Sequence, residues 1–233
     1  MINIIQHLGK RDTLDERFDC DIILLLSETI GVYVFIKRSS AIKWVFDLRT
    51  DRLILAVLSP PSAEAVAAYL KRNRSFHGPY HQLHDDSYYT PFIQKQYLRS
   101  DMNGYFDRTQ CGFWIIKKSE PDRVIGRLAF SGIIRGALQS CLMGYHLDRD
   151  EVGKGYMTEA VMSACGYMFS EWKLHRVQAD IMPGNERSIH TIERCGFVRQ
   201  GLFPKYMAIN GQWMDHVTYA RINEDYFNPE IIR

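Results

Sequence analysis

Apolar residues recur with helical spacing between residues 157 and 172. Counted from Met157 they fall at i, i+3, i+4, i+7, i+8, i+11, i+12 and i+15: Met157, Ala160, Val161, Ala164, Cys165, Met168, Phe169 and Trp172. This spacing lines one face of an α-helix, so we expect an amphipathic helix whose apolar stripe packs in the core. The run from Cys141 to Leu147 is apolar and bounded, which predicts a strand just before this helix.

The same patterns predict further elements on both sides of this unit. Strands are expected at residues 52–58, 112–118, 124–134, 177–182, 202–209 and 212–221, and helices at residues 62–72 and 92–102 and after Asn185. Asn185 is a good helix cap and Gly196 a good helix stop. Glu120-Pro121-Asp122 is predicted to turn between two strands, and Asn210-Gly211 predicts a tight type I′ hairpin. Residues 73–91 have the composition of a loop.

A glycine loop, Gly153-Lys154-Gly155, separates the predicted strand from the predicted helix. Two glycines allow the backbone to bend closely around a ligand. The unpaired amides of a first helical turn, together with the helix dipole, favour an anion such as a pyrophosphate. Neither common nucleotide motif is met, because Thr158 replaces the third glycine of G-x-G-x-x-G and no Gly-Lys-Ser/Thr is present. The pattern favours a phosphate-bearing cofactor, although a simple tight turn has the same composition.

Composition narrows the class of protein. The chain has 233 residues, 46% hydrophobic and 24% charged, with a formal net charge of +2, so nothing in its charge requires a nucleic acid or a membrane. Its five cysteines are widely spaced without a C-x-x-C pair, which argues against a disulfide framework or a zinc ribbon and favours the cytoplasm. The longest apolar run, residues 22–26, is too short to span a bilayer, and the N-terminus lacks the layout of a signal peptide.

Several segments together carry a family resemblance. After the glycine loop come Asn185-x-x-Ser188 and Cys195-Gly196-Phe197, and residues 48–53, 144–147 and 210–216 add to the pattern. The set resembles the GNAT superfamily of N-acetyltransferases over about residues 47–222. Within it, the chain is similar to the Rim-type branch of bacterial ribosomal-protein alanine N-acetyltransferases. The resemblance implies an α/β fold: a mixed, mostly antiparallel twisted sheet, V-shaped at its centre, with helices on both faces.

Residues 1–46 do not fit this pattern. We expect them to form a strand-rich N-terminal extension, with strands at residues 21–26 and 32–36 and a third at residues 44–46, ahead of an N-acetyltransferase domain at residues 47–233. The extension could lengthen the main sheet or pair with another subunit in a homodimer. A poorly ordered leader is the alternative, but the apolar content is high for a free tail.

The resemblance implies acetyl-CoA as co-substrate and places it on this chain. Its pyrophosphate would rest on the amides of the loop: Val152, Gly153, Lys154, Gly155, Tyr156 and Met157. Its pantetheine arm would pair with the strand at Tyr145, His146 and Leu147 and touch Asn185 and Ser188. The family commonly has Gln or Arg where Asp150 stands, so we expect Asp150 to point away and Arg149 or Lys154 to supply countercharge.

The resemblance also suggests two catalytic residues, Ser188 and Asp180. The leaving thiolate has a pKa of about 8.5, and a hydroxyl at Ser188 could stabilise it. Many relatives use a tyrosine where this chain has Ile192, which makes Ser188 the better candidate. Asp180 matches the position of a carboxylate base in some relatives. The alternatives are structural: Ser188 as an ordinary first-turn residue, and Asp180 as a strand-end acid paired with a lysine or arginine.

A histidine-rich segment, His77, His81 and His84 followed by Asp85 and Asp86, contains possible metal ligands. Gly78-Pro79 interrupts any helix that would align them and no cysteine is near, so we expect no metal. In the family this region lines the acceptor groove, and contact with the acceptor is the preferred interpretation.

The sequence therefore predicts an enzyme that moves an acetyl group from acetyl-CoA to an amine by direct attack in a ternary complex. The preferred acceptor is the α-amine of a protein N-terminus. Two alternatives stay open: a small amine such as a polyamine or an antibiotic-like compound, and a weakly catalytic CoA-binding sensor or scaffold. Release of thiol in the presence of a panel of amines separates the enzyme from the sensor.

Overall fold

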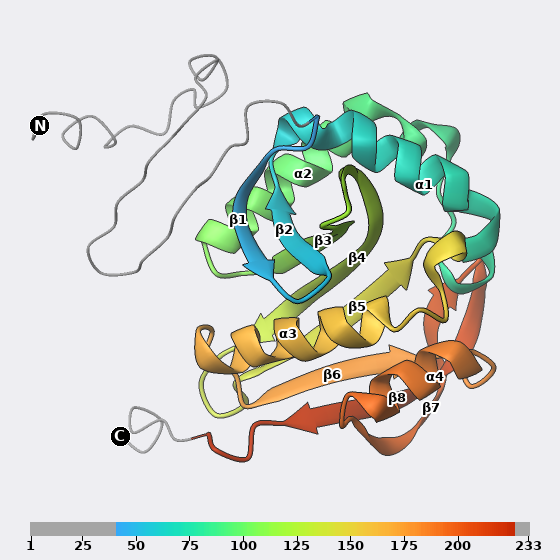
Figure 1. Cartoon of the computed structure of the whole chain (residues 1–233). Coiled ribbons are helices and arrows are strands. Elements are labelled where there is room, and N and C mark those ends of the chain that lie inside the picture. Colours follow the sequence, from blue (N-terminus) through green and yellow to red (C-terminus); the bar gives the residue numbers. More distant parts are fainter. Residues whose placement is uncertain (1–40, 227–233) are drawn as a thin grey trace, which may run out of the picture.

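A single open sheet organises the chain (Figure 1). The computed structural model describes residues 41–226, and within them eight strands lie in the order β1-β2-β3-β4-β5-β6-β8-β7. The strands are β1 (Trp44–Arg49), β2 (Leu53–Leu58), β3 (Cys111–Lys117), β4 (Glu120–Ile134), β5 (Ser140–Leu147), β6 (Arg176–Ile181), β7 (Val198–Ile209) and β8 (Gln212–Ile222). Neighbouring strands are antiparallel except β5 and β6, which run parallel.

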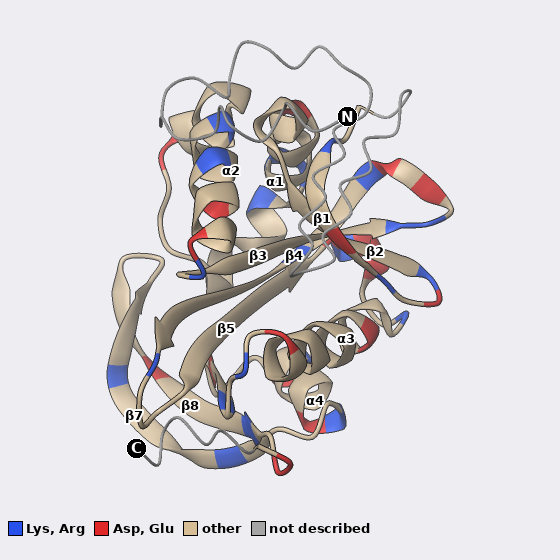
Figure 2. Ribbon diagram, turned by 90° about the vertical axis from the view of Figure 1, so that its left-hand side faces the viewer, with Lys and Arg blue, Asp and Glu red and all other residues tan. Residues whose placement is uncertain are grey.

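Helices cover both faces of the sheet (Figure 2). The helices are α1 (Ala63–His77), α2 (Pro91–Phe106), α3 (Tyr156–Ser170) and α4 (Glu186–Arg194). α1 and α2 pack over one apolar cluster, which includes Tyr69, Leu98 and Trp114, while α3 and α4 cover the larger one, which includes Met168 and Ile192. The predicted fold class, a mixed and mostly antiparallel sheet with helices on both faces, is therefore confirmed.

The predicted amphipathic helix is confirmed as α3. Its residues Met157, Ala160, Val161, Ala164, Cys165 and Met168 are all buried in the larger cluster. Phe169 packs against that cluster, and Trp172 is buried just beyond the end of the helix. The 3.6-residue period thus identified the face that anchors the glycine loop to the core.

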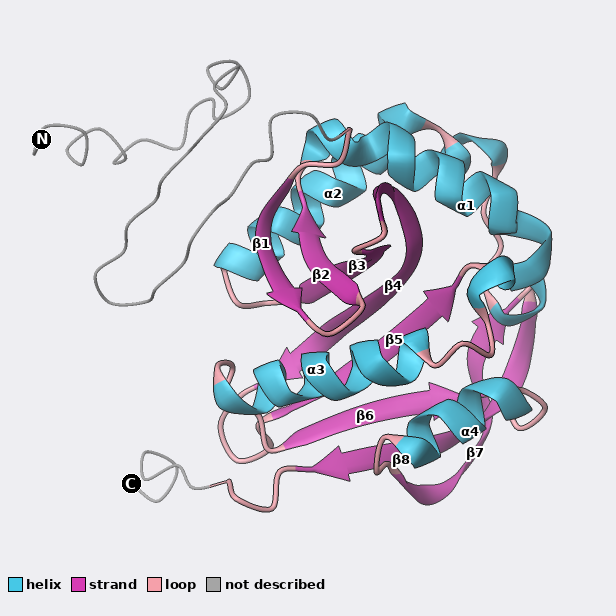
Figure 3. Cartoon of the chain, in the orientation of Figure 1, coloured by secondary structure: helices cyan, strands magenta, loops and turns pink. Residues whose placement is uncertain are grey.

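The sheet divides at its centre. β5 and β6 are aligned only at Ser140–Arg176, Cys141–Val177 and Leu142–Gln178. Beyond this point β5 continues to Leu147 beside β4, and β6 continues to Ile181 beside β8. The two halves of the sheet therefore part at the C-terminal ends of β5 and β6, and we call this opening the wedge (Figure 3).

Two local predictions were wrong. α1 continues to His77 instead of ending at residue 72, because Asn73 and His77 are buried and bonded: Asn73 Nδ2 donates to the Tyr69 carbonyl, and His77 Nε2 donates to the Leu147 carbonyl. The β3–β4 turn lies at residues 118–119, not at Glu120-Pro121-Asp122, which begin β4.

The closing hairpin matches its prediction. Asn210 (φ 47°) and Gly211 (φ 77°) both have positive φ, as a type I′ turn requires. β7 bulges between Phe203 and Met207, where the amide of Lys205 donates to Asp215 Oδ1 at 2.8 Å.

Only the end of the predicted strand-rich N-terminal extension lies within the described residues. The strands expected at residues 21–26 and 32–36 lie outside the described residues. β1 begins at Trp44, so it crosses the expected boundary after residue 46 and pairs with β2. Within residues 41–226, no helix has the length and apolar content needed to cross a bilayer.

Candidate active site

The glycine loop meets α3 in the geometry expected of an anion site. Gly153 (φ 80°) and Gly155 (φ 77°) both have left-handed backbone conformations, which favour glycine. Gly155 is the N-cap of α3 and provides no side-chain cap, and the Glu159 amide bonds to the Gly155 carbonyl at 3.1 Å. The amides that precede Glu159 are therefore available to a ligand. Residues 152–155 are exposed, whereas Met157 is buried, so Met157 can offer only its amide.

An arginine from the β1–β2 turn holds this loop in place. Arg52 Nε donates to Glu159 Oε2 at 2.6 Å, and its Nη1 donates to the carbonyl of Lys154 at 2.9 Å. The guanidinium also lies over the ring of Tyr156, 4.5 Å from its centroid. Arg52 therefore stands beside the loop as one half of an ion pair with Glu159, and nearly half of its side chain stays exposed.

The two cations expected to supply countercharge have acidic partners. Lys154 Nζ donates to Glu151 Oε2 at 2.9 Å, and Arg149 Nε donates to Asp150 Oδ1 at 3.4 Å. Asp150 is exposed, so its carboxylate is solvated. Neither Arg149 nor Lys154 is therefore a free positive charge. Arg52, which the sequence did not single out, is also paired, with Glu159, but in addition it bonds to the loop through the Lys154 carbonyl.

A buried ion network supports the other side of the loop. Glu151 is almost fully buried, and it accepts from Lys117 Nζ at 2.8 Å as well as from Lys154. Asp148, equally buried, accepts from Arg72 Nε at 2.7 Å and from Arg123 Nη2 at 3.1 Å. Burial on its own would raise the pKa values of both carboxyls, but these bonds outweigh it and lower them. Both acids are therefore ionised at neutral pH.

The wedge brings Tyr145 and Ser188 together. Tyr145 projects from β5 toward α4, where its hydroxyl donates to the Ser188 carbonyl at 2.9 Å and accepts from Ser188 Oγ at 2.6 Å. Asn185 caps α4 by accepting from the Ser188 amide at 3.3 Å, as predicted. Ser188 thus stands in the first turn of α4 and faces β5 across the opening.

Asp180 and His146 lie on the other face of the sheet. On β6 the alternate residues Val177, Ala179 and Ile181 are buried under α3 and α4, so Asp180 points toward the α1/α2 side. Its carboxylate accepts from Gln178 Nε2 at 3.1 Å and from Thr218 Oγ1 at 2.5 Å. Two uncharged side chains, those of Gln178 and Thr218, therefore hold the Asp180 carboxylate in position.

His146 faces the same side from β5. Its Nδ1 lies 2.6 Å from the hydroxyl of Tyr69, and the two rings stack. Burial, followed by the charges of His81, His77 and Arg127, lowers the pKa of His146 well below its usual value. His146 is therefore neutral at physiological pH.

The three histidines of the predicted acceptor region separate into two groups. His77 and His81 stack on each other at 5.1 Å, and both lie near the ring of His146. His84 stacks instead on Tyr88, with ring centroids 3.7 Å apart. In the part of the chain that the structure describes, no group of three His, Cys, Asp or Glu residues could hold a metal ion. The backbone carbonyl of His81 accepts from the Asn210 amide at 2.9 Å, which ties this segment to the β7–β8 hairpin.

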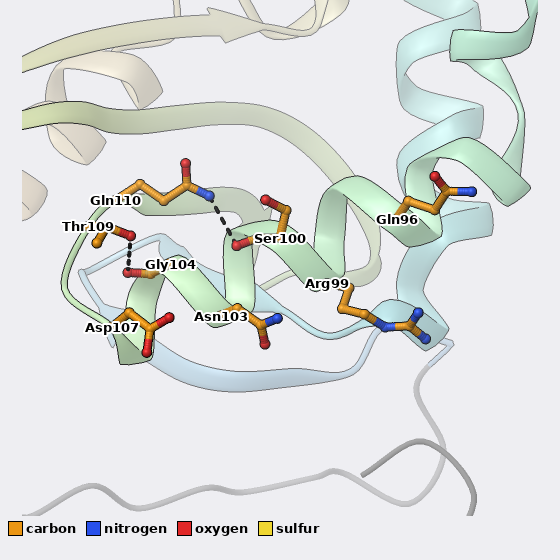
Figure 4. A pocket seen from close by; sticks show the side chains of 8 residues that line it. All are labelled: Gln96, Arg99, Ser100, Asn103, Gly104, Asp107, Thr109 and Gln110. Atoms are coloured by element: carbon orange, nitrogen blue, oxygen red, sulfur yellow. Dashed lines mark hydrogen bonds between the residues drawn. The ribbon is translucent and has the colours of Figure 1, made fainter. Parts of the chain in front are cut away.

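One surface hollow lies elsewhere. It has a volume of about 460 Å³ and is formed by polar residues between Gln96 and Gln110, at the C-terminal half of α2 and the following turn (Figure 4). Its own polar groups bond to each other, since Gln110 Nε2 donates to the Ser100 carbonyl at 3.1 Å. None of the predicted site residues lines it, so the wedge and the glycine loop remain the candidate site.

The chain matches known acetyltransferases over most of its length. Residues 52–198 match the acetyltransferase (GNAT) domain family. The probable N-acetyltransferase YjcK of Bacillus subtilis is 36% identical over 178 residues, which are 76% of this chain and 98% of that protein. The [ribosomal protein uS5]-alanine N-acetyltransferase of Escherichia coli is 33% identical over 180 residues, 77% of this chain and 92% of that protein.

A solved structure shows the same architecture. The crystal structure of the ribosomal-protein-S5-alanine acetyltransferase from Vibrio fischeri superposes with a TM-score of 0.75 at 30% identity. The superposition covers 78% of this chain and 99% of that one.

Proposed function

The chain belongs to the acetyltransferase (GNAT) family, and we propose that the acceptor of its acetyl group is the α-amine of a protein N-terminus. The chain is an N-acetyltransferase that uses acetyl-CoA. The observation that carries the proposed site is the wedge, in which β5 and β6 stop pairing after Leu142 and Gln178. An extended pantetheine arm can pair there with backbone groups of Tyr145, His146 and Leu147.

In the proposed complex, the pyrophosphate lies on the amides of residues 152–157. Backbone donors carry most of this binding, because Gly153 and Gly155 leave the backbone accessible and the start of α3 attracts an anion. Arg52, which is paired with Glu159, holds the loop through its bond to the Lys154 carbonyl. Asn185 both caps α4 and touches the cofactor arm.

Ser188 and Asp180 lie on opposite sides of the sheet, so one could serve the leaving thiolate and the other the attacking amine. The amine would approach from the face that carries Asp180 and attack the acetyl carbon, whose oxyanion is stabilised by amides of β5. The carbon–sulfur bond then breaks, and the electron pair leaves on sulfur toward α4. There Ser188 Oγ would donate a hydrogen bond to the departing thiolate, while Asp180 receives the amine proton through water.

The choice of acceptor rests on two arguments. The relative from E. coli is named for acetylation of an alanine of a ribosomal protein and matches over 92% of its length. In addition, an α-amine has a pKa of about 7.7–8.0, against about 10.4 for a lysine side chain. A site that relies on one carboxylate as its base favours the amine that is already partly neutral. A ribosomal-protein acceptor would place the reaction in the cytoplasm.

Release of CoA from acetyl-CoA with paired peptides tests this proposal. One peptide has a free N-terminal Ala or Ser and no lysine, and its partner has a blocked N-terminus and one internal lysine. We expect the free α-amine to react much faster. If the blocked peptide or a polyamine reacts faster, the N-terminal acceptor is wrong and the acetyltransferase assignment stands.

A further inference from the structure

Two hydroxyl groups meet across the wedge, and only one of them has a role in the proposed mechanism. Ser188 Oγ donates to Tyr145 Oη at 2.6 Å, and Tyr145 Oη donates to the Ser188 carbonyl at 2.9 Å. The phenol therefore contacts both the side chain and the backbone of Ser188. Since Tyr145 belongs to β5 and Ser188 to α4, this contact joins the two sides of the opening.

The bond to Tyr145 limits the orientations that the O–H group of Ser188 can adopt. A serine hydroxyl has one hydrogen and two lone pairs, and its rotor turns to suit its partners. While the Ser188 hydroxyl donates its hydrogen to Tyr145 Oη, it cannot donate a hydrogen bond to the thioester sulfur of acetyl-CoA. If it turned toward sulfur, the hydrogen of Tyr145 could swing from the Ser188 carbonyl to Ser188 Oγ. The new bond from Tyr145 to Ser188 Oγ would replace the bond that Ser188 had donated to Tyr145. It would also polarise the Ser188 hydroxyl and so strengthen the hydrogen bond from Ser188 to sulfur.

The hydroxyl of Tyr145 is suited to remain a hydrogen-bond donor. Tyr145 lies half-buried against the large apolar cluster, and burial raises its pKa far above the usual value, although the bond to Ser188 opposes this. The hydroxyl therefore keeps its hydrogen throughout the pH range of the reaction. Within residues 41–226, Tyr145 is the phenol whose hydroxyl bonds to Ser188 Oγ.

We propose that Tyr145 is a positioning residue for Ser188: its hydroxyl fixes the Ser188 rotamer and supplies a hydrogen bond to Ser188 Oγ while Ser188 stabilises the departing thiolate. This inference rests on the proposed role of Ser188. No proton is consumed: the amine nitrogen bonds to carbon, the carbon–sulfur bond breaks, and the proton that the amine gives to Asp180 returns through solvent to the thiolate sulfur.

A double-mutant cycle tests the inference on the full chain, with Tyr145→Phe, Ser188→Ala and the two combined. Rates are measured with whichever amine of a panel reacts fastest, so a wrong acceptor does not affect the test. We expect Tyr145→Phe to lower kcat roughly tenfold, the effect of about one hydrogen bond, and to leave the KM for acetyl-CoA unchanged. In the Ser188→Ala background, Tyr145→Phe should have no further effect on kcat.

Tyr167→Phe is the matched control. The hydroxyl of Tyr167 lies 2.9 Å from that of Tyr105 on the same side of the sheet, outside the wedge. Its loss should lower thermal stability about as much as Tyr145→Phe does, but should not change kcat. Ser188→Thr keeps the hydroxyl, so Tyr145→Phe should again lower kcat in that background.

Three results would overturn the inference. One is an unchanged kcat in Tyr145→Phe, and another is an equal fall in kcat with and without Ser188. The third is an unchanged kcat in Ser188→Ala with a lowered kcat in Tyr145→Phe, because Tyr145 would then act without Ser188. Each of these leaves the acceptor proposal intact, since that proposal depends on which amine reacts and not on these two side chains.

Discussion

Leu142 of β5 and Gln178 of β6 are the last aligned pair at the centre of the sheet. Past this pair, β5 stays with β4 and β6 stays with β8, so the parallel strands part while both remain anchored. Tyr145 and Ser188 lie on the two sides of this separation and bond across it, and the glycine loop follows soon after β5. The proposed cofactor site is therefore built mainly from backbone, and the substitutions that test it are those that change backbone geometry.

Replacing Gly155 with valine should abolish the rise in melting temperature that acetyl-CoA gives. Gly155 has a φ of 77°, and a Cβ there would come within 3.4 Å of Arg52 Nη2 at the proposed phosphate site. The parent protein should gain about 2.7 kcal/mol at a ligand concentration of 100 times Kd. Gly166→Ala is the control, because a Cβ on this exposed α3 residue meets nothing within 4 Å. A Gly155→Val protein that shifts like the parent would remove the loop from the mechanism.

Arg52→Ala should weaken acetyl-CoA binding about tenfold, which is ~1.4 kcal/mol, and leave kcat nearly unchanged. The substitution removes the bonds to Glu159 and to the Lys154 carbonyl that hold the loop. Arg49→Ala on the neighbouring strand end is the matched control, because Arg49 is similarly exposed and pairs with Asp47. Calorimetric titration measures both, and an equal Kd for the two variants would contradict a role for Arg52.

Asp180→Asn should lower the rate chiefly at acidic pH if Asp180 receives the amine proton. At low pH the amine is mostly protonated and depends most on a base, whereas at high pH it is neutral without help. Asparagine retains the size of the side chain and can still accept from Thr218, so the β6–β8 contact should survive. The measurement is the profile of kcat/KM against pH. A profile parallel to that of the parent would leave Asp180 with a structural role.

His81→Asn should flatten the loss of stability between pH 6.5 and pH 4. Burial, with smaller effects from His77 and His84, lowers the pKa of His81 to about 4, below its ordinary value of 6.5. Between these values the unfolded chain binds a proton that the folded chain does not, so folding free energy is lost as the pH falls through this window. Above pH 6.5 His81 is unprotonated in both the folded and the unfolded chain, so its contribution to stability is fully present.

Denaturant unfolding at several pH values measures this effect. Its control is His190→Asn on the exposed face of α4. If His81→Asn and the parent lose stability in parallel from pH 6.5 to pH 4, then His81 titrates normally in the fold and the prediction is wrong.

The sequence was most informative where one local pattern decides the structure. The apolar period from Met157 gave α3, and positive φ at Asn210 and Gly211 follows from the preference of those residues for a type I′ turn. It was misleading at Asn73 and His77, whose polar side chains suggested a loop. Both are buried and bond to distant groups, Asn73 Oδ1 accepting from the Arg149 amide and His77 donating to the Leu147 carbonyl.

In the candidate site, too, the sequence predicted the local features and missed the contacts between distant residues. The glycine loop and the Asn185 cap could be placed from short segments, because each depends on neighbouring residues. The contact between Tyr145 and Ser188 joins positions 43 residues apart, and that between Arg52 and Glu159 joins positions 107 apart. Only the fold brings such pairs together, so neither contact could be derived from local spacing.

The most direct test of the account is mass spectrometry of a proteome lysate incubated with the protein and isotopically labelled acetyl-CoA. The Gly155→Val protein serves as the control for acetylation that does not depend on the site. We predict that the label appears on α-amines of proteins that begin with Ala or Ser, and that internal lysines carry little of it. Label mainly on lysine side chains, or only on small amines with none on protein N-termini, would contradict the account.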